Sequence, residues 1–147
     1  MNVFYKYCLL FTFTWLTSQT IKYLIRLSKA QKFSLQEMYH IYVYGSGAPS
    51  SHAAVLTASL LFVIRILGIE HPISIVFTLL ILLWLYELVL QRKRHMALEK
   101  MLAHLKISKK DLFLLKDLSG HDHIDIFWGI FVGIGAYILF SKIIYTQ

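Results

Sequence analysis

Four long stretches of this chain carry almost no charge, and they constrain the fold more than any other feature of the sequence. They cover residues 3–27, 49–67, 72–90 and 124–144. Each is close to the roughly 20 mostly apolar residues that an α-helix needs to cross a bilayer. Hydrophobic residues make up 57% of the chain and charged residues only 16%, which is more apolar surface than one small soluble core can bury. The sequence therefore predicts an all-α integral membrane bundle of about four transmembrane helices in a single domain, residues 1–147.

The connections between the predicted spans differ in length and character. A short turn at 68–71 joins the second and third spans. The long connection before the fourth span contains apolar residues at helical spacing, with lysines nearby: Leu98, Met101, Leu102 and Leu105. This pattern is typical of an amphipathic helix at a membrane surface, here over about residues 95–118. The single cysteine, Cys8, excludes an internal disulfide and a cysteine-rich zinc site.

The net charge of +7 is unevenly distributed along the chain. Most of the 15 basic residues lie in the first and third connections and at the neighbouring helix ends: Lys22, Arg26, Lys29, Lys32, Arg92, Lys93, Arg94, Lys100, Lys106, Lys109, Lys110 and Lys116. Basic loops face the cytoplasm in membrane proteins, so both termini are expected outside. This distribution favours contact with anionic membrane lipids and predicts no nucleic-acid partner. We expect the protein in the plasma (inner) membrane.

The segment Gly45–His52, which leads into the second span, is the first candidate site. It reads Gly-Ser-Gly-Ala-Pro-Ser-Ser-His, where glycines allow a sharp turn and Pro49 suits the first turn of a helix. Free N–H groups and the helix dipole attract an anion there, and Ser50, Ser51 and His52 add further donors. Phosphate is the most natural ligand. The alternative is an ordinary helix cap with incidental serines.

A second candidate site opens the fourth span on the same side of the membrane. His121 and Asp125 are four residues apart, so they lie on one side of a helix. The carboxylate can accept a hydrogen bond from one ring nitrogen and leave the other as a nucleophile or base. Alone, the pair is also compatible with a capping aspartate and a solvated histidine. Its occurrence on the same side as the Pro-Ser-Ser-His segment favours the functional interpretation.

Two charged residues lie deep in otherwise apolar spans. Lys22 is expected to face a polar interior or a partner, because a buried ammonium group is costly without one. Glu87, near the end of the third span, is expected to pair with an arginine or lysine, with metal binding as the lesser alternative. Gly129 and Gly133 form a Gly-x-x-x-Gly pattern in the fourth span, which predicts close packing of helices.

Taken in order and in context, these segments resemble the divergent phosphatidic acid phosphatase type 2 family, also described as acid phosphatase/vanadium-dependent haloperoxidase-related. The family pattern has a lysine in the first helix, a Gly-Gly-Met-Pro-Ser-Ser-His-Ser-Ala block, a Tyr-Asp block followed by paired arginines, and a Gly-His-x-x-x-(Glu/Asp) block before a glycine-rich helix. The matching positions here are Lys22, Gly45–Ala53, Tyr86-Glu87 with Arg92, and Gly120-His121 with Asp125 and Gly129. The resemblance extends from about Gln19 to the end of the fourth span.

The wider superfamily uses the blocks Lys-x6-Arg-Pro, Pro-Ser-Gly-His and Ser-Arg-x5-His-x3-Asp, and this chain departs from each of them. Lys29 has the spacing of the first arginine but lacks the proline after it. Ser51 replaces the glycine of the second block, and Leu115 stands at the arginine position of the third. By the resemblance, Arg92 or Arg94 supplies the missing cation.

The resemblance implies a membrane-embedded phosphatase that hydrolyses a lipid phosphate monoester or diphosphate at the cytoplasmic face. Neither a metal nor a cofactor is implied. In the implied mechanism His121 attacks phosphorus to form a phosphohistidine, Asp125 orients the ring of His121, and His52 protonates the leaving group. The groups implied to hold the phosphoryl oxygens are Lys22, Ser50, Ser51, Gly120 and Arg92 or Arg94.

The same residues are also compatible with a function without catalysis. The same pocket could bind a lipid phosphate or inorganic phosphate without cleaving it. The missing arginine favours such a non-catalytic protein, whereas the two histidines and the aspartate favour catalysis. A transporter subunit is disfavoured, because the polar residues gather at one face and none lies near the bilayer midplane. A homodimer is left open, since four short helices enclose little space for a lipid.

Overall fold

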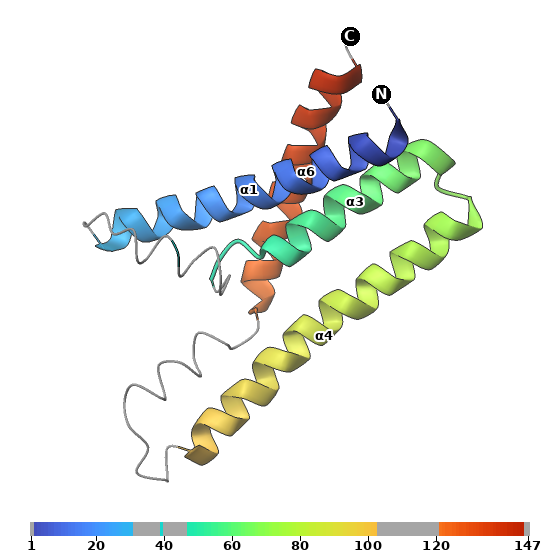
Figure 1. Cartoon of the computed structure of the whole chain (residues 1–147). Helices are drawn as coiled ribbons and strands as arrows, with labels where there is room; N and C mark the ends of the chain where they lie inside the picture. Colours follow the sequence, from blue (N-terminus) through green and yellow to red (C-terminus); the bar gives the residue numbers. More distant parts are fainter. Residues whose placement is uncertain (1, 31–38, 40–46, 103–120, 146–147) are drawn as a thin grey trace.

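The computed structural model describes residues 2–30, 39, 47–102 and 121–145. Within these ranges the chain forms helices and turns and contains no β-strand. The helices are α1 (Val3–Ala30), α3 (Ser51–Leu67), α4 (Pro72–Leu102) and α6 (His123–Tyr145), arranged as in Figure 1. The all-α prediction is confirmed for the part of the chain that the structure describes.

Helix α3 begins and ends at residues suited to those positions. Ser50 is the N-cap, with an extended backbone and a side-chain oxygen that accepts a hydrogen bond from the Ala53 N–H at 3.4 Å. Gly68 ends the helix with φ +89°, a conformation that glycine adopts without strain. Pro72 then begins α4, where its missing N–H costs no hydrogen bond. The structure therefore has a short turn at 68–71, as the sequence predicts.

Helix α4 continues beyond the predicted end of the third span at residue 90 and reaches Leu102. Residues 91–102 contain neither proline nor glycine and consist mainly of strong helix formers, so nothing in the local sequence stops the helix. Residues 95–102, predicted as the start of a separate interfacial helix, are thus the last turns of α4. The rest of that predicted helix, 103–118, lies outside the described residues.

Helix α3 contacts each of the other three helices. Towards its C-terminal end, one cluster of buried side chains joins it to α1 and α6: Leu10, Ala58, Phe62 and Phe140. At its N-terminal end, a second cluster joins it to α4 and α6: Ala53, Leu88, Val89 and Ile126. The second cluster holds the start of α6 against the start of α3, which is where the candidate site residues lie.

Two glycines bring α6 very close to α3. A Cβ on Gly129 would collide with the carbonyl oxygen of Ser50 and lie 2.8 Å from the Ala53 Cβ. One turn later, a Cβ on Gly133 would collide with the carbonyl oxygen of Ala54. Only glycine leaves room for this approach. The close packing therefore agrees with the Gly-x-x-x-Gly prediction, and it sets the first turns of α6 against the N-cap of α3.

Two of the described helices, α4 and α6, are long and apolar enough to cross a membrane. Many of their large apolar side chains are exposed, as at Leu83, Trp84 and Phe131. Helix α3 is apolar but has 17 residues, and α1 buries polar side chains at Thr14, Ser18, Gln19 and Lys22. The structure supports two of the four predicted spans, and crossings by α1 and α3 remain predictions.

Candidate active site

Lys22 of α1 is buried against the N-terminus of α3. Only 1% of the residue is exposed, and its Nζ donates a hydrogen bond to Ser51 Oγ at 3.1 Å. Ser50 and Ser51 are also buried. Three kinds of donor meet here: the ammonium group of Lys22, the hydroxyl of Ser51 and the first N–H groups of α3. The N–H groups are available because the first turn of an α-helix has no acceptor for them within the helix. These groups are hydrogen-bond donors or carry positive charge, which suits an anion.

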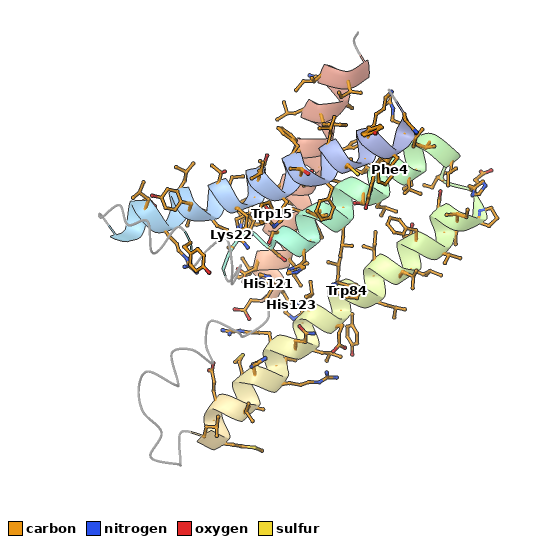
Figure 2. The ribbon with its side chains drawn as sticks, viewed as in Figure 1. Phe4, Trp15, Lys22, Trp84, His121 and His123 are labelled. Atoms are coloured by element: carbon orange, nitrogen blue, oxygen red, sulfur yellow. The ribbon has the colours of Figure 1, made fainter. Side chains whose placement is uncertain are left out.

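His121 and His52 lie next to each other at this end of the bundle. His121 directly precedes α6 and is buried, whereas His52 in the first turn of α3 is exposed. Their ring centroids are 5.9 Å apart, with 57° between the ring planes. Figure 2 shows Lys22 and His121 near one another and Phe4 at the far end of the bundle. The structure brings the two predicted histidines together with the predicted lysine.

Asp125 lies one helical turn after His121, and it also accepts hydrogen bonds from nearby backbone N–H groups. Its Oδ2 is 3.8 Å from His121 Nδ1 and accepts a hydrogen bond from the Asp122 N–H at 3.3 Å. The Ser50 N–H donates to the Asp125 carbonyl at 2.8 Å, which ties the N-cap of α3 to α6. His121 Nδ1 is buried and has no hydrogen-bond partner among the described residues. The Asp125 carboxylate is therefore placed to accept from it after a small movement, as catalytic hydrogen bonds often tighten on substrate binding.

The environment of His121 favours the uncharged ring. Burial lowers the pKa of His121 to about 4, the nearby charge of Lys22 is the next cause, and His52 follows. The carboxylate of Asp122 acts in the opposite direction. At neutral pH the ring is therefore unprotonated at one nitrogen, which leaves the lone pair that a nucleophile or a base needs.

Acidification is expected to destabilise the protein through His121. The unfolded chain has the ordinary histidine pKa of 6.5, so between pH 6.5 and about 4 it binds a proton that the folded chain excludes. The contribution to stability is fully present above pH 6.5 and is lost as the pH falls towards 4, by up to about 3 kcal/mol. Thermal unfolding of the wild type and of His121→Gln at about pH 7.5 and about pH 4.5 measures this loss. The exposed neighbour provides a control, His123→Gln, which should keep the wild-type pH dependence. An unchanged pH dependence in His121→Gln would contradict the expectation.

The two arginines predicted to hold phosphate occupy different places. Arg92 Nε is 3.3 Å from Asp122 Oδ1, which puts this arginine beside the residue that follows His121. Arg94 is exposed and donates to Glu87 Oε1 at 2.8 Å. Arg92 therefore lies at the edge of the site. Arg94 is instead the partner of Glu87, for which the sequence predicts a pair with an arginine or lysine.

Arg26 is a cation near the site that the sequence prediction missed. A Cβ built on Gly47 would lie 3.8 Å from Arg26 Nη2, so the guanidinium is next to the segment that leads into α3. The signal for it in the sequence is its position four residues after Lys22, on the same side of α1. Two predicted positions lie outside what the structure describes, Gly120 and the side chain of Lys29.

The assembled groups have the properties of an oxyanion site with a reactive imidazole. Lys22, Ser51 and the start of α3 provide donors, and His121 provides an uncharged ring nitrogen. Within the described ranges, no three His, Cys, Asp or Glu side chains gather to hold a metal ion. In this arrangement His121 can attack an anionic ester held by these donors. His52 lies close enough to exchange a proton with that ester.

Comparison with known families matches residues 5–136 of the chain to the Divergent PAP2 family. Comparisons with curated proteins and with solved structures give no match. The family match spans every described site residue, from Lys22 to Asp125, and confirms the family resemblance that the sequence motifs indicate. Because it covers most of the chain as well as the site, this protein belongs to the Divergent PAP2 family, whose fold is related to that of phosphatases.

Proposed function

We propose that the protein is a membrane-embedded lipid phosphatase that works through a phosphohistidine intermediate. The observation that carries the proposal is the buried, uncharged ring of His121 beside Lys22 and the N-terminus of α3. Lys22, Ser51 and the first N–H groups of α3 hold the phosphoryl oxygens, and Arg92 adds positive charge at the edge. Preorganised donors and charges of this kind are usually the largest single contribution to catalysis.

The reaction proceeds in two steps at phosphorus. His121 Nε2 attacks phosphorus while Nδ1, which faces Asp125, keeps its proton and donates a hydrogen bond to the carboxylate oxygen. The bond from phosphorus to the leaving oxygen breaks, and protonated His52 gives that oxygen a proton. Water then attacks the phosphohistidine and loses a proton to His52, and the N–P bond breaks. Inorganic phosphate leaves, and both histidines return to their starting protonation states.

The apolar surface next to the site supports a lipid as the substrate. Large side chains are exposed in the first turns of α6, directly after and around Asp125: Ile124, Phe127, Trp128 and Phe131. In a bilayer these side chains contact acyl chains, and the phosphate of the same lipid reaches His121 at the interface. In this arrangement all four helices cross the inner membrane, the chain is one domain, and the site faces the cytoplasm.

A second candidate function is phosphate binding without cleavage. The observation that favours it is Leu115, which stands where the wider superfamily has a phosphate-binding arginine. Such a protein would bind a lipid phosphate or inorganic phosphate through the same donors. Replacement of His121 separates the two functions, since an enzyme loses turnover and a binding protein loses only part of its affinity.

Phosphate release by the purified protein in mixed micelles tests the proposed function. The substrates are phosphatidate, phosphatidylglycerophosphate, polyprenyl phosphate and polyprenyl diphosphate, and orthovanadate serves as the inhibitor that mimics the transition state. We expect release from at least one lipid and its inhibition by vanadate. Vanadate binding without release from any of the four lipids would support the binding protein instead.

Replacement of Lys22 with methionine is expected to separate activity from stability. The change removes the ammonium group that donates to Ser51 Oγ, and it keeps most of the side-chain volume. Phosphate release should fall by about 10–1000-fold, by analogy with the loss of one oxyanion donor. The melting temperature should not fall, because a buried ammonium group is costly and an apolar side chain of similar size is not. A melting temperature well below that of the wild type would instead assign Lys22 a structural role.

The matched control for this variant is Lys93→Met. Lys93 is exposed on α4 and takes no part in the proposed chemistry. Both variants remove one lysine and leave the same side chain, so they change the net charge equally. Phosphate release by Lys93→Met should stay within about twofold of the wild type, as expected for an exposed residue without a role in the site.

A further inference from the structure

The site has fewer arginines than its superfamily pattern requires. The two arginine positions of that pattern are occupied by Lys29 and Leu115 in this chain. Of the two arginines of α4, Arg92 lies at the edge of the site beside Asp122, and Arg94 pairs with Glu87. Lys22 is thus the cation at the N-terminus of α3 and Arg92 the cation at the edge, and a dianionic phosphate would gain from a further cation close to α3.

Arg26 lies where it can compensate that charge. It follows Lys22 by one turn of α1 and is only partly exposed. Its Nη2 is 3.8 Å from the position that a Cβ on Gly47 would take, so the guanidinium lies against the backbone that enters α3. Gly47 has φ +100°, a backbone conformation that glycine adopts without strain. Lys22 and Arg26 therefore approach the N-terminus of α3 from the same helix.

We propose that Arg26 is a phosphate-binding residue of this site and takes the place of the missing superfamily arginine. The inference rests on the proposed function for its biological meaning, but it concerns binding of the phosphoryl group itself. A guanidinium can donate two parallel hydrogen bonds to two phosphoryl oxygens, which an ammonium group cannot do. In this arrangement Lys22 neutralises the charge of the phosphoryl group beside Ser51, and Arg26 fixes the orientation of the phosphoryl oxygens.

Binding of orthovanadate to the full-length protein in detergent tests the role of Arg26. The variants are Arg26→Ala and Arg26→Lys, with Arg65→Ala as the control, because Arg65 lies in the last turn of α3 at the opposite end of the bundle. We expect Arg26→Ala to raise the Kd for vanadate at least about 10-fold, in line with loss of a charge-assisted hydrogen-bonding group. Arg26→Lys should recover only part of the affinity, and Arg65→Ala should match the wild type.

The outcomes separate this inference from the proposed function. A Kd for Arg26→Ala within about twofold of the wild type would overturn the inference, even if the wild type releases phosphate from lipids. Weaker vanadate binding by Arg26→Ala would support it, even if no lipid is cleaved and the phosphatase proposal fails. Should Arg26→Ala not fold, the comparison of Arg26→Lys with the wild type decides, because unchanged affinity in that variant also overturns the bidentate role.

Discussion

Replacing His121 with alanine is expected to lower phosphate release by at least about 10⁴-fold, since removal of a catalytic nucleophile has effects of this size or larger. The ring is buried next to Lys22 and His52 and is uncharged at neutral pH. Among the described histidines, His121 is the only buried one, and Asp125 lies one turn after it. The measurement is the initial rate of phosphate release from the best lipid of the panel, at saturating substrate.

His123→Ala is the matched control for this variant. His123 is two residues further along the chain, is exposed, and begins α6. Its replacement removes the same side chain from the same segment and should leave phosphate release within about twofold of the wild type, as for other exposed positions. Comparable losses in both variants would show that the segment, and not the His121 ring, is what activity requires.

Gly129→Ala is expected to destabilise the protein and to reduce activity together. The added Cβ would collide with the Ser50 carbonyl oxygen, so α3 and α6 must separate. Such overpacking costs about 1–3 kcal/mol. The separation also disturbs the hydrogen bond from the Ser50 N–H to the Asp125 carbonyl, which is 2.8 Å long in the wild type. The measurements are the melting temperature in detergent and the rate of phosphate release.

The control on the same helix is Gly135→Ala. A Cβ at Gly135 has no neighbour within 4 Å in the described structure, and alanine is favoured over glycine inside a helix by about 1 kcal/mol. This variant should therefore be as stable as the wild type or more stable, with unchanged activity. A melting temperature for Gly129→Ala equal to that of Gly135→Ala would contradict the close approach of α6 to α3.

The helices could be predicted from the sequence because hydropathy and local chemistry agree at most of their ends. Ser50, Gly68 and Pro72 each have a distinct backbone role, and each marks a helix end in the structure. The end of α4 could not be predicted in this way. Hydropathy falls at residue 90, but helix propensity does not, and the two quantities report different things. Hydropathy measures how readily a residue enters an apolar environment such as lipid. Helix propensity measures how readily its backbone adopts a helix.

The average hydropathy of α1 also combines two different properties of the helix. Averaging over a window weighs every residue equally, whereas only the outward face of a helix contacts lipid. Several polar residues of α1 lie on its buried face, as at Thr14, Ser18 and Lys22. These side chains lower the average although they face the other helices. The helix predicted for this segment is present in the structure, and its crossing of the membrane stays a prediction.

The site could be predicted where its contacts are local or follow a motif. His121 and Asp125 are four residues apart on the chain, and the Pro-Ser-Ser-His segment predicts the start of α3. The contact of Lys22 with Ser51 was predictable only through the family pattern, because it joins two helices. Arg26 was missed for the same reason, since its approach to Gly47 depends on how α1 packs beside α3.

The most direct test of the account is to trap the covalent intermediate on the enzyme. The wild-type protein is mixed with a ³²P-labelled lipid phosphate during turnover, quenched in alkali to preserve phosphohistidine, and analysed by mass spectrometry of its peptides. We predict a phosphoryl group on His121 that forms during turnover, disappears as substrate is consumed, and is absent from His121→Ala. Turnover without any label on His121, or a label that persists in His121→Ala, would contradict the account.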